Sequence, residues 1–295
     1  MSTAGRAFAQ AKVNLALRIL GKNRDGYHSI ETVFLRLELA DAVTVRVTDR
    51  ARSLRCDVMK GENPESNLGF RAARVFADAI GWPRGFEIVI EKQIPIGGGL
   101  GGGSADAAAV LRILNKLSPQ AVTDAKLLAL AATLGADVPF LTTDHAMALG
   151  WGRGEKLEPL VPLQQRNLAL LVPSRGMSTA EAYAIVASAR GDYDTRPRSL
   201  SAELFRSWDH AARHAVNEFE PFLGDALPDM HKWLETGARL GLLTRLSGSG
   251  STVFIVDAGT KDSLQSAIAS LGLNADTRVI RTRTAASVVP IEVLD

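Results

Sequence analysis

The chain has 295 residues, of which 46% are hydrophobic and 22% charged, with a net charge of +2, a composition typical of a globular protein with one large or two ordinary domains. It contains neither a Lys/Arg cluster nor a run of about 18 uncharged apolar residues, so we expect no nucleic-acid partner and no membrane span. The single cysteine, Cys56, excludes an internal disulfide and a multi-cysteine metal site, and an N-terminus without an apolar signal segment predicts a cytoplasmic protein.

The first half of the chain contains both strand and helix patterns. Loose apolar alternation predicts strands over residues 7–20, 32–39, 41–47 and 86–91, with a turn signal at 21–26. Helical periodicity predicts helices over residues 66–80, 105–117 and 123–134. A strand and loop are expected over 146–154. The chain therefore begins as a β-meander and continues into helices.

A Pro-containing composition shift at residues 158–162 predicts a boundary between a domain at 1–160 and a domain at 161–295. Beyond it, strands are expected over residues 167–172, 252–256 and 277–283. Helices are expected over residues 178–189, 199–206, 208–223, 227–240 and 259–271. Because strands and helices come in blocks rather than in strict alternation, the expected class is α+β.

The most informative segment is IPIGGGLGGGS, residues 94–104, which joins the strand at 86–91 to the helix at 105–117. Six glycines are costly to order, but they let backbone N–H groups approach an anion at the positive end of a helix. With Ser104 as N-cap, the segment predicts a phosphate cradle, and a flexible linker is the alternative. No Walker A lysine follows Gly103, so the positive charge must come from elsewhere in the chain.

Three polar residues are candidates for chemistry. Lys12 lies in a strand, where a lysine usually marks a solvated face; alternatively it supplies the missing cation, with Asn14 on the same face. Asp137 precedes Val138 and Pro139, which suits an N-cap as well as a carboxylate that accepts a proton from a substrate hydroxyl.

Two further motifs have both structural and functional interpretations. Tyr27 and His28 end a turn. Either Tyr27 fills the turn and His28 is a surface imidazole, or the two hold a pyrimidine, since tyrosine stacks on a base and histidine reads its edge. A second small-residue loop contains Ser247, Gly248 and Gly250 and joins two strands. It is either a tight sheet connection or a place where backbone approaches a ligand.

Taken together, Lys12 and the loops at 95–104 and 247–250 resemble the three motifs of the small-molecule kinase superfamily that contains galactokinase, homoserine kinase and mevalonate kinase. AKVNLALRILGKNRDGYH (11–28), LGADVPF (134–140) and GRGE (152–155) resemble the branch that acts on a cytidine-diphosphate-linked methylerythritol. The resemblance implies two α+β domains with the active site in the cleft between them. It also implies that ATP phosphorylates a hydroxyl of this substrate and that the product is the 2-phosphate. The reaction would belong to the non-mevalonate route to isoprenoid precursors.

The same resemblance implies roles for individual residues. Asp137 would take the proton of the attacking hydroxyl, and Lys12 would stabilise charge and orient that carboxylate. The residues that would wrap the ATP phosphates are Pro95, Gly97, Gly98, Gly99, Gly101, Gly102, Gly103 and Ser104. The residues that would hold the substrate are Asn14, Tyr27, His28 and Tyr183, with Asn67 near the adenine. Mg²⁺ is expected to accompany ATP, and the sequence does not assign its protein ligands. The protein is expected to be a monomer or a weak dimer.

Two alternatives stay open from the sequence. One is a sibling activity, homoserine or phosphomevalonate kinase, against which Tyr27 and His28 count. The other is a catalytically silent nucleotide-binding module, against which the presence of both Lys12 and Asp137 counts.

Overall fold

The computed structural model describes residues 3–22, 28–58, 63–190, 196–259 and 263–294. Their strands are β1 (Ala4–Lys22), β2 (His28–Thr48), β3 (Arg52–Cys56), β4 (Gly85–Glu91), β5 (Met147–Gly152), β6 (Lys156–Pro159), β7 (Asn167–Val172), β8 (Val216–Asn217), β9 (Thr244–Leu246), β10 (Val253–Val256), β11 (Arg278–Arg283) and β12 (Glu292–Leu294). Their helices are α1 (Leu68–Ile80), α2 (Gly102–Leu117), α3 (Asp124–Ala132), α4 (Val138–Thr142), α5 (Thr179–Arg190), α6 (Trp208–His214), α7 (Pro228–Arg239) and α8 (Ser263–Ser270), with 3₁₀ helices at Pro64–Ser66 and Ala202–Phe205.

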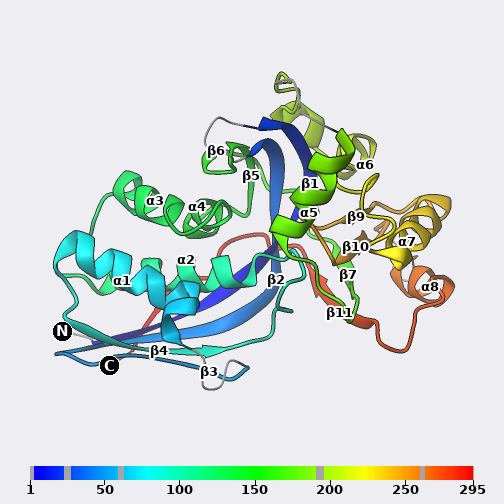
Figure 1. Ribbon diagram of the computed structural model, residues 1–295. Coiled ribbons are helices and arrows are strands. Elements are labelled where there is room, and N and C mark those ends of the chain that lie inside the picture. Colours follow the sequence, from blue (N-terminus) through cyan, green and yellow to red (C-terminus); the bar gives the residue numbers. More distant parts are fainter. Residues whose placement is uncertain (1–2, 23–27, 59–62, 191–195, 260–262, 295) are drawn as a thin grey trace.

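The strands form two sheets. The larger has the order β12-β1-β2-β4-β3, with β5 paired to β2, β6 to β5 and β8 to β1; the smaller has the order β11-β7-β10-β9. Helices α1 and α2 lie against the larger sheet, and α7 and α8 lie beside the smaller one (Figure 1). The predicted α+β class is confirmed.

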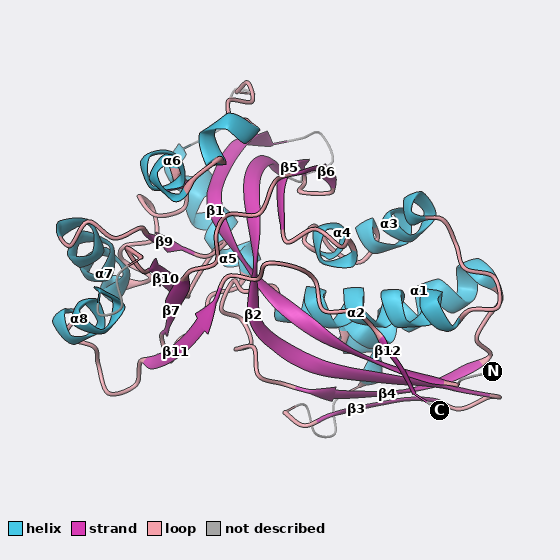
Figure 2. Cartoon of the chain, turned by 180° about the vertical axis from the view of Figure 1, so that it is seen from behind, coloured by secondary structure: helices cyan, strands magenta, loops and turns pink. Residues whose placement is uncertain are grey.

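The long pair β1 and β2 joins the two halves of the molecule (Figure 2). The expectation of two separate strands at 32–39 and 41–47 is wrong, because β2 is one strand of 21 residues. Asp41 does not interrupt it: the carboxylate is buried and accepts hydrogen bonds from the backbone N–H groups of Gln93 and Ile94. A buried carboxylate with such partners is compatible with an unbroken strand.

Three other boundaries differ from those expected. Helix α2 begins at Gly102, and its N-cap is Gly101, with φ 71°, so Ser104 lies in the first turn and is not the N-cap. The segment at 199–206 forms only a 3₁₀ helix. The helix expected over 208–223 ends at His214, because β8 pairs with β1 and the buried Asn217 side chain donates to two backbone carbonyls of the second small-residue loop and its strand.

Two hydrophobic cores hold these layers together. The first lies around the larger sheet and α2, and Trp208 and Phe254 from the second half of the chain contribute to it. The second lies around the smaller sheet, and Leu17 and Ile19 from β1 contribute to it. Each half therefore supplies side chains to the core of the other, while the boundary at residue 160 stays a prediction. Of the helices in the described part of the chain, none has the length and hydrophobicity that crossing a bilayer requires.

Candidate active site

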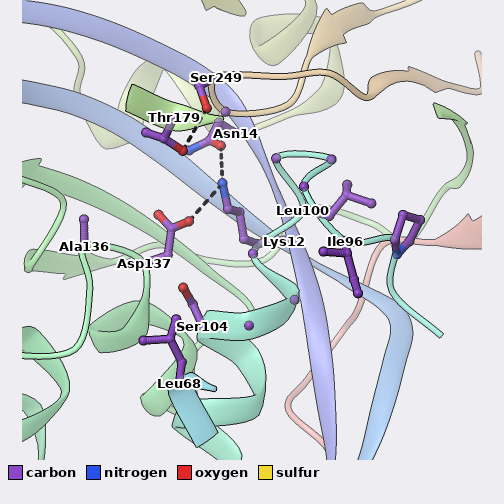
Figure 3. Close-up of a pocket in the computed structure, with 18 of the residues that line it drawn as sticks. Lys12, Asn14, Leu68, Ile96, Leu100, Ser104, Ala136, Asp137, Thr179 and Ser249 are labelled. Carbon is purple, nitrogen blue, oxygen red and sulfur yellow. Dashed lines mark hydrogen bonds and ion pairs between the residues drawn. The ribbon is translucent and has the colours of Figure 1, made fainter. Parts of the chain in front are cut away.

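A cavity of about 510 Å³ lies where the glycine-rich loop, the second small-residue loop and the N-terminal ends of α2 and α5 meet (Figure 3). The sequence-predicted residues that line it are Lys12, Asn14, Asn67, Pro95, Gly97, Gly98, Gly99, Gly101, Gly102, Gly103, Ser104, Asp137, Tyr183 and Gly248. Ser247, Gly250 and His28 lie outside its lining, and Tyr27 lies outside the described residues.

Lys12 and Asp137 meet in this cavity although they are far apart in sequence. The Lys12 Nζ atom lies 3.2 Å from Asp137 Oδ2 and donates a hydrogen bond of 2.8 Å to Asn14 Oδ1 (Figure 3). Asn14 in turn donates to the Thr32 hydroxyl at 2.7 Å. The Lys12 side chain is 4% exposed and that of Asp137 is 29% exposed. Lys12 is therefore no solvated strand lysine, and the carboxylate remains open to a ligand.

Local backbone irregularities place both residues. The pairing of β1 with β2 shifts register between Gln10 and Lys12, and the Lys12 N–H donates instead to the Leu100 carbonyl at 3.0 Å. Asp137 occupies the N-cap position of α4, but its side chain makes no capping hydrogen bond. Pro139 fits the first turn of α4, which begins at Val138. The N-cap interpretation of Asp137 is thus right for the backbone, while the carboxylate is directed to Lys12.

The glycine-rich loop needs its glycines for conformation and for space. Gly97, Gly99 and Gly101 have φ values of 73°, 74° and 71°, which L side chains rarely adopt. A Cβ on Gly99 would lie 2.1 Å from the Ser247 carbonyl oxygen. The Ser247 hydroxyl donates to the Gly99 carbonyl at 2.9 Å. The second loop is therefore a support for the first, and it reaches the cavity at Gly248.

A second lysine in the cavity lining went unpredicted. Lys92 Nζ contacts Asp41 Oδ2 at 2.5 Å and Asp106 Oδ2 at 2.7 Å, and all three side chains are at most 8% exposed. Burial raises the pKa of Asp106 to about 7, Lys92 opposes that rise and Asp41 adds to it. Burial alone would lower the pKa of Lys92, but Asp106 and Asp41 together raise it. Each residue is ordinary in sequence, so no local signal could have found this cluster.

Aromatic rings line the side of the cavity near α5. Tyr183 stacks on His28 with ring centroids 4.3 Å apart and an angle of 14°, and it meets Phe219 edge-on at 4.9 Å. Burial and the Lys22 charge lower the pKa of His28. Sequence reasoning missed Phe219 and the hydroxyl pair of Thr179 and Ser249, in which Ser249 donates to Thr179 at 3.1 Å (Figure 3).

Leu68 lies on the side of the cavity away from Thr179 and Ser249 (Figure 3), and Asn67, which precedes it, also lines the cavity. Its Oδ1 atom accepts from the Gly69 N–H at 2.8 Å, which makes it the N-cap of α1. Leu68 and Ser66 line the same end. Asn67 therefore stabilises the helix that borders this part of the cavity.

The two-sheet frame, the glycine-rich loop at the start of α2 and the Lys12–Asp137 pair define a small-molecule kinase of the superfamily expected from the sequence. In agreement, residues 67–145 match the model described as "GHMP kinases N terminal domain". Curated relatives named 4-diphosphocytidyl-2-C-methyl-D-erythritol kinase include that of Pelotomaculum thermopropionicum, 37% identical over 94% of this chain and 97% of the relative, and that of Mycolicibacterium smegmatis, 39% identical over 86% and 81%. The chain belongs to the 4-diphosphocytidyl-2-C-methyl-D-erythritol kinase family.

Solved structures agree with this family. A crystal structure of 4-(cytidine 5'-diphospho)-2C-methyl-D-erythritol kinase superposes with a TM-score of 0.74 at 34% identity, covering 95% of this chain and 98% of that one. Homoserine kinase from Cytophaga hutchinsonii shares the fold, with a TM-score of 0.71 at 17% identity over 100% of this chain and 98% of that one. The predicted family and its enzyme class are confirmed.

Proposed function

We propose that this chain transfers the γ-phosphoryl group of ATP to a hydroxyl of 4-diphosphocytidyl-2-C-methyl-D-erythritol and forms the 2-phosphate. The observation that carries the proposal is the contact of 3.2 Å between Lys12 Nζ and Asp137 Oδ2 in a cavity lined by the glycine-rich loop. The names of the relatives supply the substrate. The family resemblance places the reaction in the non-mevalonate route to isoprenoid precursors.

The glycine-rich loop is suited to the triphosphate. Its glycines leave backbone N–H groups accessible, and the unsatisfied N–H groups of the first turn of α2 carry partial positive charge toward the cavity. Phosphoryl transfer depends mainly on positioning and charge stabilisation and needs little covalent help from the protein. Amides in this loop and the Lys12 ammonium would together neutralise charge on the transferring group.

Asp137 is suited to accept the proton of the attacking hydroxyl, because its carboxylate is partly exposed to the cavity. Lys12 holds that carboxylate in place and brings positive charge beside it. Asn14 fixes the ammonium, and Asn14 is itself fixed by Thr32. This chain of contacts keeps the pair oriented before substrate binds.

The aromatic end of the cavity is suited to the cytosine. The Tyr183 ring, supported by His28 and Phe219, offers a stacking face, and the proposed roles of His28 and Tyr27 at the base edge rest on the family resemblance. The Asn67 end would then take the adenine. A nucleotide lying along the glycine-rich loop between these ends would have its terminal phosphate near Lys12.

Mg²⁺ bound to ATP takes most of its ligands from phosphates and water, with one or two protein oxygens. The Ser104 hydroxyl lines the cavity and would supply such an oxygen, while the described residues contain no group of three or more His, Cys, Asp or Glu suited to a metal. The ion would neutralise charge on the phosphates. Cytoplasmic location and a monomeric or weakly dimeric state stay predictions.

A coupled assay of ADP release tests the proposal. The purified chain is given ATP and Mg²⁺ with 4-diphosphocytidyl-2-C-methyl-D-erythritol, homoserine or phosphomevalonate in parallel reactions. We expect turnover with the first substrate alone, and preferred turnover of either of the others would show the sibling activity. ATP binding without ADP release from any of the three would show a silent nucleotide-binding module.

A further inference from the structure

Arg36 is a buried cation beside the proposed catalytic pair. It lies on β2 directly opposite Lys12 in the β1–β2 ladder, so the two side chains leave the same face of the sheet. Arg36 is 1% exposed. Burial, together with the Arg112 charge, lowers the pKa of Arg36 to about 9, with Asp144 opposing, so the guanidinium still carries its charge at neutral pH.

The guanidinium is bound by backbone carbonyls of one short segment. Arg36 Nη2 donates to the carbonyls of Phe140 at 2.9 Å and Thr143 at 2.8 Å, and Nε donates to that of His145 at 2.8 Å. The Arg36 backbone N–H donates to Ala146 at 2.9 Å. These carbonyls belong to the C-terminal end of α4 and the turn after it, where a cation is favoured by the helix dipole.

Aromatic contacts of Phe140 also hold α4 against β2. The Arg36 Cζ atom lies 4.9 Å from the centre of the Phe140 ring. That ring stacks on Phe34, two residues before Arg36 on the same face of β2, with centroids 4.8 Å apart. Every residue of α4 is buried. The helix therefore has one tightly held position on the sheet.

Asp137 lies at the other end of this helix. Because α4 has five residues, its two ends are only about 7 Å apart at 1.5 Å per residue, and the orientation of one end determines that of the other. The Asp137 carboxylate makes no capping hydrogen bond that would hold it to its own helix. Its place against Lys12 depends on where α4 lies, and Arg36 sets where α4 lies.

We propose that Arg36 is a positioning residue for phosphoryl transfer, which holds the C-terminal end of α4 so that the Asp137 carboxylate stays against Lys12. The proposal rests on the proposed function, since it takes Asp137 as the group that accepts the proton. A displacement of about 1 Å at a reacting group is enough to cost about 100-fold in rate.

Arg36→Lys tests the proposal because it keeps the charge and removes the forked donor that holds three carbonyls. We expect kcat to fall about 10-fold to 100-fold, while KM for ATP and the affinity for a non-hydrolysable ATP analogue stay within about threefold. The matched control is Arg166→Lys. Arg166 also donates to a backbone carbonyl, that of Asp257, at 2.9 Å and lies 5.3 Å from the Trp208 ring centre, but neither partner belongs to α4. Its kcat should stay normal.

A double-mutant cycle separates positioning from stability. If Arg36 acts through Asp137, Arg36→Lys should cost little further activity in an Asp137→Asn background, because the carboxylate that it positions is gone. Equal losses in both backgrounds, or an unchanged kcat in Arg36→Lys alone, would overturn the positioning role. Wild-type turnover in the Asp137→Asn single variant would show that Asp137 is not the base, and the positioning role would then fail as well. The single variant therefore distinguishes failure of the proposed function from failure of the positioning role alone.

Discussion

Two lysines face the same cavity, but they stand in different surroundings. Lys12 contacts one carboxylate, that of Asp137, whose side chain is 29% exposed. Lys92 lies between two carboxylates, those of Asp41 and Asp106, whose side chains are 0% and 3% exposed. The Lys12–Asp137 pair is the open pair, because its carboxylate is partly exposed to the cavity. The Lys92 cluster borders the same cavity with side chains that are almost fully buried, and we call it the closed cluster.

The difference in exposure indicates different roles: the open pair takes part in the reaction, and the closed cluster holds the glycine-rich loop in place. The partly exposed Asp137 carboxylate can exchange a proton with a ligand, whereas the Asp41 and Asp106 carboxylates are almost fully buried and both contact Lys92. In the described part of the chain, Asp106 Oδ1 has no hydrogen-bond partner. Asp41 also accepts from the backbone N–H groups of Gln93 and Ile94, just before the glycine-rich loop, and Asp106 lies in α2 just after it. The Lys92 cluster therefore ties the two ends of the loop together, and the Lys12 pair serves the reaction.

The largest expected effect is on the open pair. Asp137→Asn keeps the size of the side chain but removes the proton acceptor, so kcat should fall about 100-fold to 10,000-fold. Binding of an ATP analogue, measured by calorimetry, and the thermal midpoint should change little. Lys12→Ala should lower kcat on a similar scale. Near-normal rates in either variant would refute the assigned roles.

The next effect concerns the closed cluster. Lys92→Met leaves Asp41 and Asp106 buried without a counter-charge, which should lower the free energy of unfolding by about 3–5 kcal/mol. Lys12→Met should cost clearly less, because the Asp137 carboxylate can be solvated. Urea unfolding of both variants makes the comparison. Equal losses would contradict the division between a structural and a chemical lysine.

A smaller effect separates the two ends of the cavity. Tyr183→Ala removes a stacking face at the aromatic end of the cavity, so the cytidine substrate should bind about 1–3 kcal/mol more weakly. The affinity for an ATP analogue, whose adenine would lie at the Asn67 end, should stay the same. Titration of each ligand separately checks this, and matching losses for both would argue against the assigned ends.

The smallest effect is a pH dependence of stability from the closed cluster. The pKa of Asp106 rises from the ordinary 3.8 to about 7, so between these values the folded chain holds a proton that the unfolded chain has lost. This contribution to stability is present at low pH and is lost as pH rises toward about 7. Asp106→Asn removes the titrating group, so its free energy of unfolding should fall less than that of the wild type between about pH 5 and about pH 8. Parallel pH profiles would show that Asp106 does not titrate there.

The open pair could be predicted from the sequence, and the closed cluster could not. Lys12 and Asp137 lie in unusual local contexts, a lysine in an apolar strand and an aspartate before Val-Pro, and a family resemblance supported both. Asp41, Lys92 and Asp106 are brought together only by the packing of β2, β4 and α2, which no local pattern encodes.

Backbone geometry accounts for the other differences. Its residue type makes Ser104 a suitable N-cap, but Gly101 in the left-handed conformation starts α2 earlier. The short strands β8 and β12 have two and three residues, too few for alternation to be visible, and pairing with β1 defines them. The longer elements follow the hydrophobic pattern, while short elements such as β3, β6 and α4 and the ends of the longer ones depend on contacts across the chain.

The glycine-rich loop is bonded on both sides. Its Leu100 carbonyl accepts from Lys12 N–H, its Gly99 carbonyl accepts from the Ser247 hydroxyl, and its Gly98 carbonyl accepts from Thr252 N–H at 3.2 Å. Separating the two halves of the molecule would break the bonds from Ser247 and Thr252, while the bond from Lys12 lies within the first half. We therefore expect nucleotide to come and go past the rim, where the Ile96 side chain is 67% exposed, while the floor of the cavity stays still.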